Sequence, residues 1–143
     1  MSTTICFDFG NTRLKAAIFK GNQLEKLELL ENDAIASVQK LLDQYKPSKT
    51  LLSSVIHHDK AIESLLTNYG PFHLLGPQTK LNFTTPVGKP ETIGADRLGL
   101  VAAAVDLYPA QHSLVICLGT CITYNFVNNQ GQFLGGSISP GMQ

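Results

Sequence analysis

A glycine-containing turn near the start of the chain combines residue types suited to phosphate chemistry. Residues 8–12 have the sequence DFGNT, and Lys15 follows shortly after. Gly10 allows backbone N–H groups to approach a phosphate closely, while Asn11 and Thr12 add side-chain donors. Lys15 adds a positive charge, and Asp8, at the end of an apolar segment, can hold a hydrated divalent cation that bridges ATP phosphates. An ordinary hairpin uses the same residue types, so that interpretation stays open.

A second turn, with the sequence GTCIT at residues 119–123, offers similar backbone geometry and the hydroxyls of Thr120 and Thr123. Taken alone, Gly119 and its neighbours favour a plain hairpin. The turn gains significance because the segments around both turns have the same order: apolar strand, glycine turn, strand. Such a repeat suggests a duplicated domain whose two halves face one ligand.

A third motif, ETIGADR at residues 91–97, opens an apolar helix. An acid in the first turn is favoured by the helix dipole, so simple capping explains Asp96. The same dipole disfavours Arg97, which suggests that the pair has another role. An ionised Asp96 at a helix start can accept a proton from a substrate hydroxyl. Arg97 can hold a substrate carboxylate or a phosphoryl group in transfer.

Hydrophobic patterning predicts the elements that position these motifs. The expected strands are 4–7, 14–19, 24–30, 51–55, 72–75, 114–117, 122–127 and 133–137. The expected helices are 34–45, capped by Asp33, then 59–69 and 94–108. A polar loop punctuated by Pro and Gly covers 78–91. This order indicates an α/β fold with a mixed sheet flanked by helices.

The composition narrows the class of protein. The 143 residues are 43% apolar and 15% charged, which is typical of a folded domain with a core. The 11 basic and 11 acidic residues balance, so no basic excess steers the chain to nucleic acid or to an anionic membrane. The start lacks a signal peptide, no apolar run is long enough to span a bilayer, and three cysteines fit a reducing compartment. We therefore expect a cytoplasmic protein that binds neither nucleic acid nor membrane.

The ordered motifs resemble those of type III pantothenate kinases. They are D-x-G-N-T-x-x-K at 8–15, G-x-D-R at 94–97, G-T-x-x-T at 119–123 and G-G-x-I-x-P-G at 135–141. The resemblance covers the whole chain, and the set of four in this order is specific although each motif is modest.

The resemblance implies a ribonuclease H-like fold of the actin, sugar-kinase and Hsp70 ATPase type, duplicated and dimeric. Residues 1–112 would form the first domain with the substrate helix, and residues 113–143 the first strands of an incomplete second domain. The implied reaction transfers the γ-phosphate of ATP to the primary hydroxyl of pantothenate, giving 4'-phosphopantothenate in the first step of coenzyme A synthesis.

The resemblance also assigns roles to residues. Asp96 matches the general base, and Gly94 and Arg97 match the pantothenate site beside it. The phosphate-binding residues implied are Asp8, Gly10, Asn11, Thr12 and Lys15 for the first turn and Gly119, Thr120 and Thr123 for the second. A divalent cation such as Mg²⁺, held in part by Asp8, and a monovalent cation, K⁺ or NH₄⁺, are implied as cofactors. The full-length enzyme is expected to be a homodimer.

Three departures from the family pattern matter. Cys117 and Asn125 stand where the family usually has Asp, so two carboxylates are missing from the second phosphate and cation site, which would weaken or rearrange cation binding. A substrate-loop tyrosine of the family has no clear counterpart in residues 84–90. Family members also continue for about another domain's length, so we expect this chain to be incomplete and inactive alone.

Two alternatives to the pantothenate kinase stay open. One is a non-catalytic regulator on the same fold, resembling the Bvg accessory factor. The missing carboxylates at Cys117 and Asn125 favour this regulator, whereas the balanced charge disfavours direct contact with DNA. The other is a small-molecule kinase of the same superfamily that acts on a sugar or acetate. The G-x-D-R helix start at 94–97 favours pantothenate over those substrates.

Overall fold

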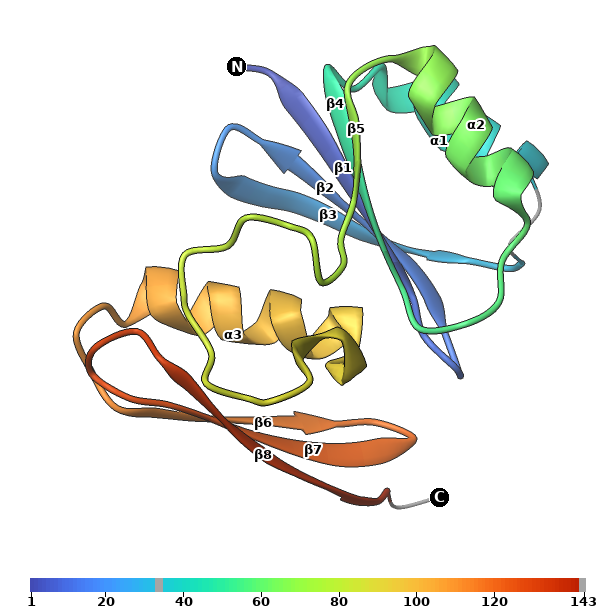
Figure 1. The fold of residues 1–143 in the computed structure, drawn as a ribbon. Helices are drawn as coiled ribbons and strands as arrows, with labels where there is room; N and C mark the ends of the chain where they lie inside the picture. Colours follow the sequence, from blue (N-terminus) through green and yellow to red (C-terminus); the bar gives the residue numbers. More distant parts are fainter. Residues whose placement is uncertain (33–34, 142–143) are drawn as a thin grey trace. The chain divides into compact units, whose positions relative to one another are not determined.

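A computed structural model of the chain describes residues 1–32 and 35–141. The chain forms two compact units, Met1–Leu75 and Gly76–Gln143, and each is described by itself (Figure 1). The expected cap Asp33 and the expected first helical residue Ala34 lie outside the described residues. The sequence predicts a domain boundary after residue 112, where the second copy of the strand–turn–strand repeat begins. That boundary stays a prediction and differs from the division after Leu75.

The first unit begins with a three-stranded meander. Strands β1 (Thr3–Phe9), β2 (Leu14–Lys20) and β3 (Gln23–Leu30) pair antiparallel in sequence order. Gly21, at a φ of 57°, makes the tight turn between β2 and β3, where a residue with a side chain would be strained. The alternation of apolar residues in β1 and β2 places one face of the meander in the core, as a half-buried sheet requires.

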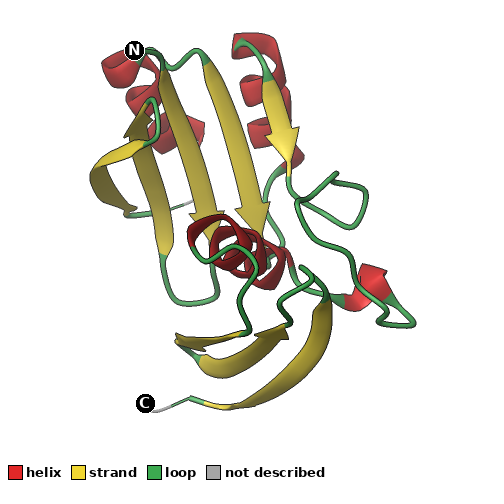
Figure 2. Cartoon of the chain, turned by 90° about the vertical axis from the view of Figure 1, so that its left-hand side faces the viewer, coloured by secondary structure: helices red, strands yellow, loops and turns green. Residues whose placement is uncertain are grey.

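Two parallel strands extend this meander. Strand β4 (Lys49–Ser54) pairs parallel with β1, and β5 (Phe72–Leu74) pairs parallel with β4, which gives the order β3-β2-β1-β4-β5. Helices α1 (Ile35–Tyr45) and α2 (Lys60–Tyr69) make the connections. Figure 2 shows both helices behind the five-stranded sheet, on a single face.

The core of the first unit lies between that sheet face and the two helices. Strand β1 contributes Ile5, Phe7 and Phe9, which are almost fully buried because every second residue points to the helices. The other buried members of this cluster are Ala16, Ile18, Val38, Leu41, Leu42, Leu52, Ile62 and Leu66. Val38, Leu41 and Leu42 of α1 and Ile62 and Leu66 of α2 thus face the sheet, whereas Ile35, the first residue of α1, is 40% exposed.

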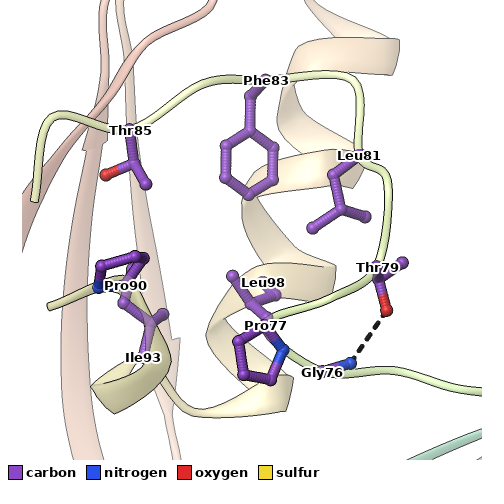
Figure 3. A pocket seen from close by; sticks show the side chains of 9 residues that line it. All are labelled: Gly76, Pro77, Thr79, Leu81, Phe83, Thr85, Pro90, Ile93 and Leu98. Carbon is purple, nitrogen blue, oxygen red and sulfur yellow. Dashed lines mark hydrogen bonds between the residues drawn. The ribbon is translucent and has the colours of Figure 1, made fainter.

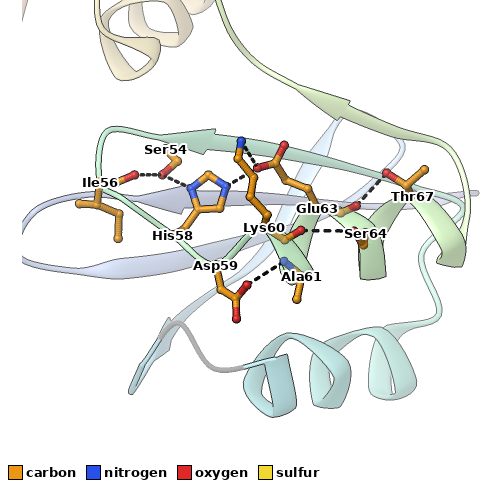
Figure 4. A network of polar contacts seen from close by, with 9 residues as sticks. All are labelled: Ser54, Ile56, His58, Asp59, Lys60, Ala61, Glu63, Ser64 and Thr67. Atoms are coloured by element: carbon orange, nitrogen blue, oxygen red, sulfur yellow. Dashed lines mark hydrogen bonds and ion pairs between the residues drawn. The ribbon is translucent and has the colours of Figure 1, made fainter.

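A polar network fixes the start of α2 against the end of β4 (Figure 4). The Oγ of Ser54 lies 2.9 Å from Nδ1 of His58, whose Nε2 lies 2.8 Å from a carboxylate oxygen of Glu63. The ammonium of Lys60 is 2.9 Å from the same oxygen. Lys60 and, to a smaller extent, His58 hold the pKa of the Glu63 carboxyl below its usual value. Asp59 caps the helix by accepting from the backbone N–H of Ala61 at 2.9 Å.

The second unit packs one helix on a three-stranded antiparallel sheet. A long loop with a short 3₁₀ turn at Pro90–Thr92 leads into α3 (Ala95–Leu107). Strands β6 (Ser113–Leu118), β7 (Cys121–Val127) and β8 (Phe133–Pro140) follow in the order β6-β7-β8. Figure 2 shows α3 end-on over one face of this sheet, and Val101, Val127 and Phe133 form the core there.

The opposite face of this sheet is apolar and open. Leu114, Ile116 and Leu118 on β6 are 59%, 50% and 78% exposed. In the register between β6 and β7 they lie opposite Phe126, Tyr124 and Ile122 of β7, respectively. Aligning the two glycine turns places these β6 residues at the positions of Ile5, Phe7 and Phe9 in β1, which are buried beneath α1 and α2. The repeat thus has the same apolar alternation twice. Helices α1 and α2 cover this face in the first unit, whereas in the described part of the second unit the corresponding residues of β6 are exposed.

The strands and helices expected from the sequence form within a few residues of the expected bounds. The largest difference is β8, which continues to Pro140 rather than ending at residue 137, because its pairing with β7 runs on to the Cys121 position. Among the described residues, no helix is both long and apolar enough to cross a membrane.

Candidate functional site

The first glycine turn joins β1 to β2. The backbone N–H of Gly10 donates to the carbonyl of Arg13 at 3.0 Å, which leaves Asn11 and Thr12 exposed at the tip. Asp8 and Lys15 lie opposite each other in the β1–β2 register, and their charged atoms are 3.8 Å apart. Both side chains are half-exposed, so this ion pair is weak and leaves the lysine able to bind an anion.

Ser53 joins this site from the neighbouring strand, and the sequence analysis missed it. It lies beside Asp8 in the parallel β1–β4 register, so Lys15, Asp8 and Ser53 form a row on the same sheet face. Within the described part of the chain, its buried hydroxyl has no hydrogen-bond partner. The signal that could have revealed it is the polar pair SS at the end of an apolar strand.

Asp8, Lys15 and Ser53 suit a divalent cation that binds together with a nucleotide. They suit less well a metal ion held by protein side chains alone. Across residues 1–32 and 35–141, no group of three His, Cys, Asp or Glu side chains could hold an ion. Mg²⁺ is commonly bound by one or two carboxylates together with substrate phosphates and water. Asp8 could supply one such carboxylate, and the ammonium of Lys15, 3.8 Å from it, could bind phosphate oxygens.

The second glycine turn, between β6 and β7, lies against the end of β8. The N–H of Gly119 donates to the carbonyl of Cys121 at 3.1 Å, and the N–H of Gly141 donates to the carbonyl of Thr120 at 3.0 Å. A Cβ on Gly141 would lie 2.2 Å from the carbonyl oxygen of Gly119. A glycine at position 141 is therefore required for this close approach, which links the second and fourth motifs.

The third motif forms the start of α3 as expected. Gly94 is the N-cap, and its carbonyl accepts from the N–H groups of Arg97 and Leu98 at 3.1 and 3.2 Å. A carboxylate oxygen of Asp96 accepts from the N–H of Arg97 at 2.8 Å. Asp96 lies in the first helical turn, where the helix dipole stabilises its negative charge. It is partly exposed, as a group that accepts a proton from a ligand must be.

A buried asparagine connects this helix start to the strand after the second turn. The Nε of Arg97 donates to Oδ1 of Asn125 at 2.7 Å. The Nδ2 of Asn125 donates to Oγ1 of Thr123 and to the carbonyl of Val115, both at 3.2 Å. The guanidinium carbon of Arg97 also lies 5.7 Å from the ring centroid of Phe133. Arg97 and Thr123, predicted site residues from different motifs, thus share one hydrogen-bonded partner.

The loop before α3 is tied to the sheet of the same unit. Thr84 accepts from the N–H of Phe133 at 2.8 Å and donates its own N–H to Gly131 at 3.1 Å. The loop and the helix start line a cavity of about 140 Å³, to which Leu81, Phe83 and Leu98 contribute apolar side chains and Thr79 and Thr85 polar ones (Figure 3). Ile93 and Leu98, which flank Asp96 in sequence, line it, but Asp96 and Arg97 do not. The polar residues of the third motif, Asp96 and Arg97, therefore lie outside the lining of this cavity.

Comparison with known proteins identifies the family. The family model described as type III pantothenate kinase matches residues 4–143. The chain belongs to the type III pantothenate kinase family. A type III pantothenate kinase of Christiangramia forsetii is 38% identical over 141 residues, which are 97% of this chain and 58% of that protein. One of Bacteroides fragilis is 34% identical over 139 residues, which are 96% of this chain and 57% of that protein.

The chain thus spans less than three fifths of the length of these pantothenate kinase relatives. A crystal structure from Bacteroides thetaiotaomicron, of a protein with an actin-like ATPase fold and unknown function, aligns with 99% of this chain and 71% of its own. The TM-score is 0.51 and the identity 9%, so this likeness shows the fold alone. It confirms the predicted actin-type α/β fold.

The two positions where a family carboxylate is replaced, Cys117 and Asn125, have different surroundings. Cys117 pairs with Thr123 across β6 and β7 and is partly exposed, so it places a thiol beside a predicted phosphate residue. Asn125 is fully buried, and both ends of its amide are bonded within the unit. From the sequence, Asn125 is interpreted as a lost cation ligand. In the structure, the same side chain faces the cationic Arg97.

Proposed function

We propose that this chain supplies the ATP- and pantothenate-binding residues of an enzyme that phosphorylates pantothenate. The observation that supports the proposal most is the network Arg97–Asn125–Thr123. It joins the predicted pantothenate residue on α3 to a predicted phosphate residue on β7. Membership of the type III pantothenate kinase family supports the same substrate pair.

The chemistry needs few groups, because phosphoryl transfer depends mostly on positioning and charge neutralisation. Asp96 accepts the proton of the primary hydroxyl of pantothenate. That oxygen bonds to the γ-phosphorus of ATP as the bond from phosphorus to the β,γ-bridging oxygen breaks, and ADP leaves. The terminal nitrogens of Arg97 bind the carboxylate of pantothenate. Lys15 and backbone N–H groups of the two glycine turns, other than those of Gly10 and Gly119, which donate within their turns, bind phosphate oxygens, each turn within its own unit.

The cofactors and assembly follow the same proposal. Asp8 would hold Mg²⁺ or another divalent cation together with the nucleotide phosphates, and this cation would neutralise phosphate charge. K⁺ or NH₄⁺ is proposed as a second cofactor on the strength of the family resemblance. We also propose that the enzyme acts in the cytoplasm as a homodimer. Equal numbers of acidic and basic residues support the absence of nucleic-acid or membrane partners.

A substitution at Asp96 tests the base. ADP release is measured with and without pantothenate for the chain and for a fusion that continues it with the remaining residues of the Christiangramia forsetii relative. Asp96→Asn should lower pantothenate-dependent kcat by about 10²–10⁴-fold, the usual contribution of a general base. Asp106→Asn is the matched control, because Asp106 is exposed near the end of the same helix.

Two results would contradict the proposal. Turnover of the Asp96→Asn fusion within about twofold of the unmodified fusion would remove Asp96 from the role of base. ADP release that does not depend on pantothenate in the unmodified fusion would remove pantothenate as the substrate and favour another kinase of the superfamily. Circular dichroism of both variants checks that the helix is intact.

A further inference from the structure

Two buried hydroxyls on β4 make no hydrogen bond within the described part of the chain. They belong to Thr50 and Ser53, which are 4% and 8% exposed. A buried hydroxyl without a partner costs free energy, so each of them needs a physical explanation. The two side chains point to opposite faces of the sheet, because the residues are three positions apart in one strand. Their surroundings therefore have to be considered separately.

Thr50 faces the apolar core of the first unit. It lies beside Ile5 in the β1–β4 register, on the face that α1 and α2 cover. Leu52, two positions further along β4, points into the same core. The methyl group of Thr50 suits these apolar surroundings, so the burial of its hydroxyl follows from packing.

Ser53 has no such methyl group and lies on the other face, in a row of polar side chains. It lies beside Asp8 in the parallel β1–β4 register, and Asp8 lies beside Lys15 in the antiparallel β1–β2 register. Neighbouring strands are about 4.8 Å apart, so the three side chains follow one another across the sheet. The charged atoms of Asp8 and Lys15 are 3.8 Å apart. Ser53 and Lys15 therefore flank the carboxylate of Asp8 on opposite sides.

This order of charges favours a hydrated cation over a phosphate oxygen as the partner of Ser53. A phosphate oxygen beside Ser53 would also lie near the negative carboxylate of Asp8, which would repel it. Lys15 offers phosphate oxygens a favourable position on the other side of Asp8. A Mg²⁺ ion bound by one carboxylate keeps several water molecules, and the charge of the ion makes those waters strong hydrogen-bond donors. The Oγ of Ser53 has lone pairs to accept from such a water.

We propose that Ser53 is a positioning residue that binds a water molecule of the divalent cation held by Asp8. It thereby fixes the place of the cation and its nucleotide at the first glycine turn. This inference rests on the ATP binding of the proposed function, but not on pantothenate as the substrate. Because the hydroxyl of Ser53 has no partner within the described chain and gains one with the ligand, its removal should affect stability and binding differently.

Ser53→Ala gives the first test, on the chain without nucleotide or metal. Hydrogen exchange of peptides from β1 and β4 should stay within about twofold of the parent or become slower, because the substitution removes an unpaired buried hydroxyl. Thr50→Val is the matched control, since it removes the other unpaired hydroxyl from the same strand at nearly constant shape, and it should behave in the same way. Faster exchange in Ser53→Ala, or failure of this variant to fold, would assign the hydroxyl a structural role and overturn the proposal.

Calorimetric titration of the fusion protein with ATP gives the second test. With Mg²⁺ present, Ser53→Ala should raise the Kd for ATP about tenfold, as expected for the loss of one hydrogen bond in a charged site. With EDTA in place of Mg²⁺, its Kd should stay within about twofold of the parent. Thr50→Val should bind ATP like the parent with Mg²⁺, because its side chain points to the opposite face of the sheet.

Three results of the titration would contradict the role of Ser53. If Ser53→Ala binds ATP with Mg²⁺ as tightly as the parent does, this inference fails while the proposed function stands. If the variant weakens ATP binding equally with and without Mg²⁺, the hydroxyl contacts the nucleotide itself, and its assignment to the cation is wrong. If the unmodified fusion does not bind ATP with Mg²⁺, the proposed function fails and this inference fails with it.

Discussion

Replacing Gly136 by alanine should separate β8 from β7. Gly136 lies opposite Asn125 in the β7–β8 register, where β8 passes very close to the neighbouring backbone. A Cβ at this position would lie 1.6 Å from the carbonyl oxygen of Tyr124 and 2.7 Å from its carbonyl carbon. Because these are backbone atoms, no side-chain rotation can relieve the overlap.

The size of the effect follows from those distances. Ordinary contact begins at 3.4 Å, so roughly 1.8 Å of separation is missing and β8 has to retreat by about that amount. An N–H···O bond of about 2.9 Å stretched so far no longer counts as a hydrogen bond. If about three ladder bonds are lost at about 1 kcal/mol each, Gly136→Ala destabilises the second unit by about 3 kcal/mol.

Hydrogen exchange measured by mass spectrometry is the suitable assay, because two units need not unfold in one transition. Peptides from β7 and β8 should exchange about 100-fold faster in Gly136→Ala, since 1.4 kcal/mol is a factor of ten. Peptides from β1 and β4 should be unaffected. Gly88→Ala makes the same chemical change where nothing lies within 4 Å, and it should leave all peptides unchanged. Equal exchange of β8 in both variants would refute the close approach.

Two further predictions concern other parts of the chain. Glu63→Gln should destabilise the first unit by less than about 1 kcal/mol at pH 7. Because the pKa of the Glu63 carboxyl is lowered in the folded state, its contribution to stability is complete above about pH 4.5 and is lost as the pH falls through the folded pKa. The free energies of unfolding of variant and parent, measured with urea, should therefore converge near pH 2. Leu118 lies on the open sheet face, so Leu118→Ser should reduce the binding of a hydrophobic dye and any self-association measured by sedimentation, without loss of stability. If the variant self-associates as much as the parent, this face is not the cause of self-association.

Local patterning predicted the elements of the fold well but not their order in the sheet. The alternation of Ile5, Phe7 and Phe9 is sufficient to place β1, and Asp59 marks the start of α2. The position of β4 between β1 and β5 depends on pairing between residues more than 40 positions apart, such as Thr4 with Lys49. Such pairing depends on the closure of long loops and on packing, which no local window contains.

The sequence motifs located most residues of the candidate site. The remaining residues, such as Ser53, could be placed only from the strand pairing in the structure. Asp96 and Arg97 are where the helix signal predicts them, yet the partner of Arg97 comes from a strand that the sequence does not connect to it. The alternation of β7 could have placed Asn125 on the face covered by α3, together with Thr123. Its pairing with Arg97 depends on how α3 packs. A residue interpreted from the sequence as a missing carboxylate therefore makes three hydrogen bonds in the structure, one of them to the cationic Arg97.

The contact between Gly141 and the second glycine turn has a consequence for the entropy of ligand binding. The turn cannot open without breaking the bond from Gly141 to the carbonyl of Thr120, and the two backbones are too close for any larger residue. The conformational freedom of Gly119 and Thr120 is therefore lost when the hairpin folds, before any anion arrives. An anion that binds to this turn meets a preorganised backbone, and more of its interaction energy remains as affinity.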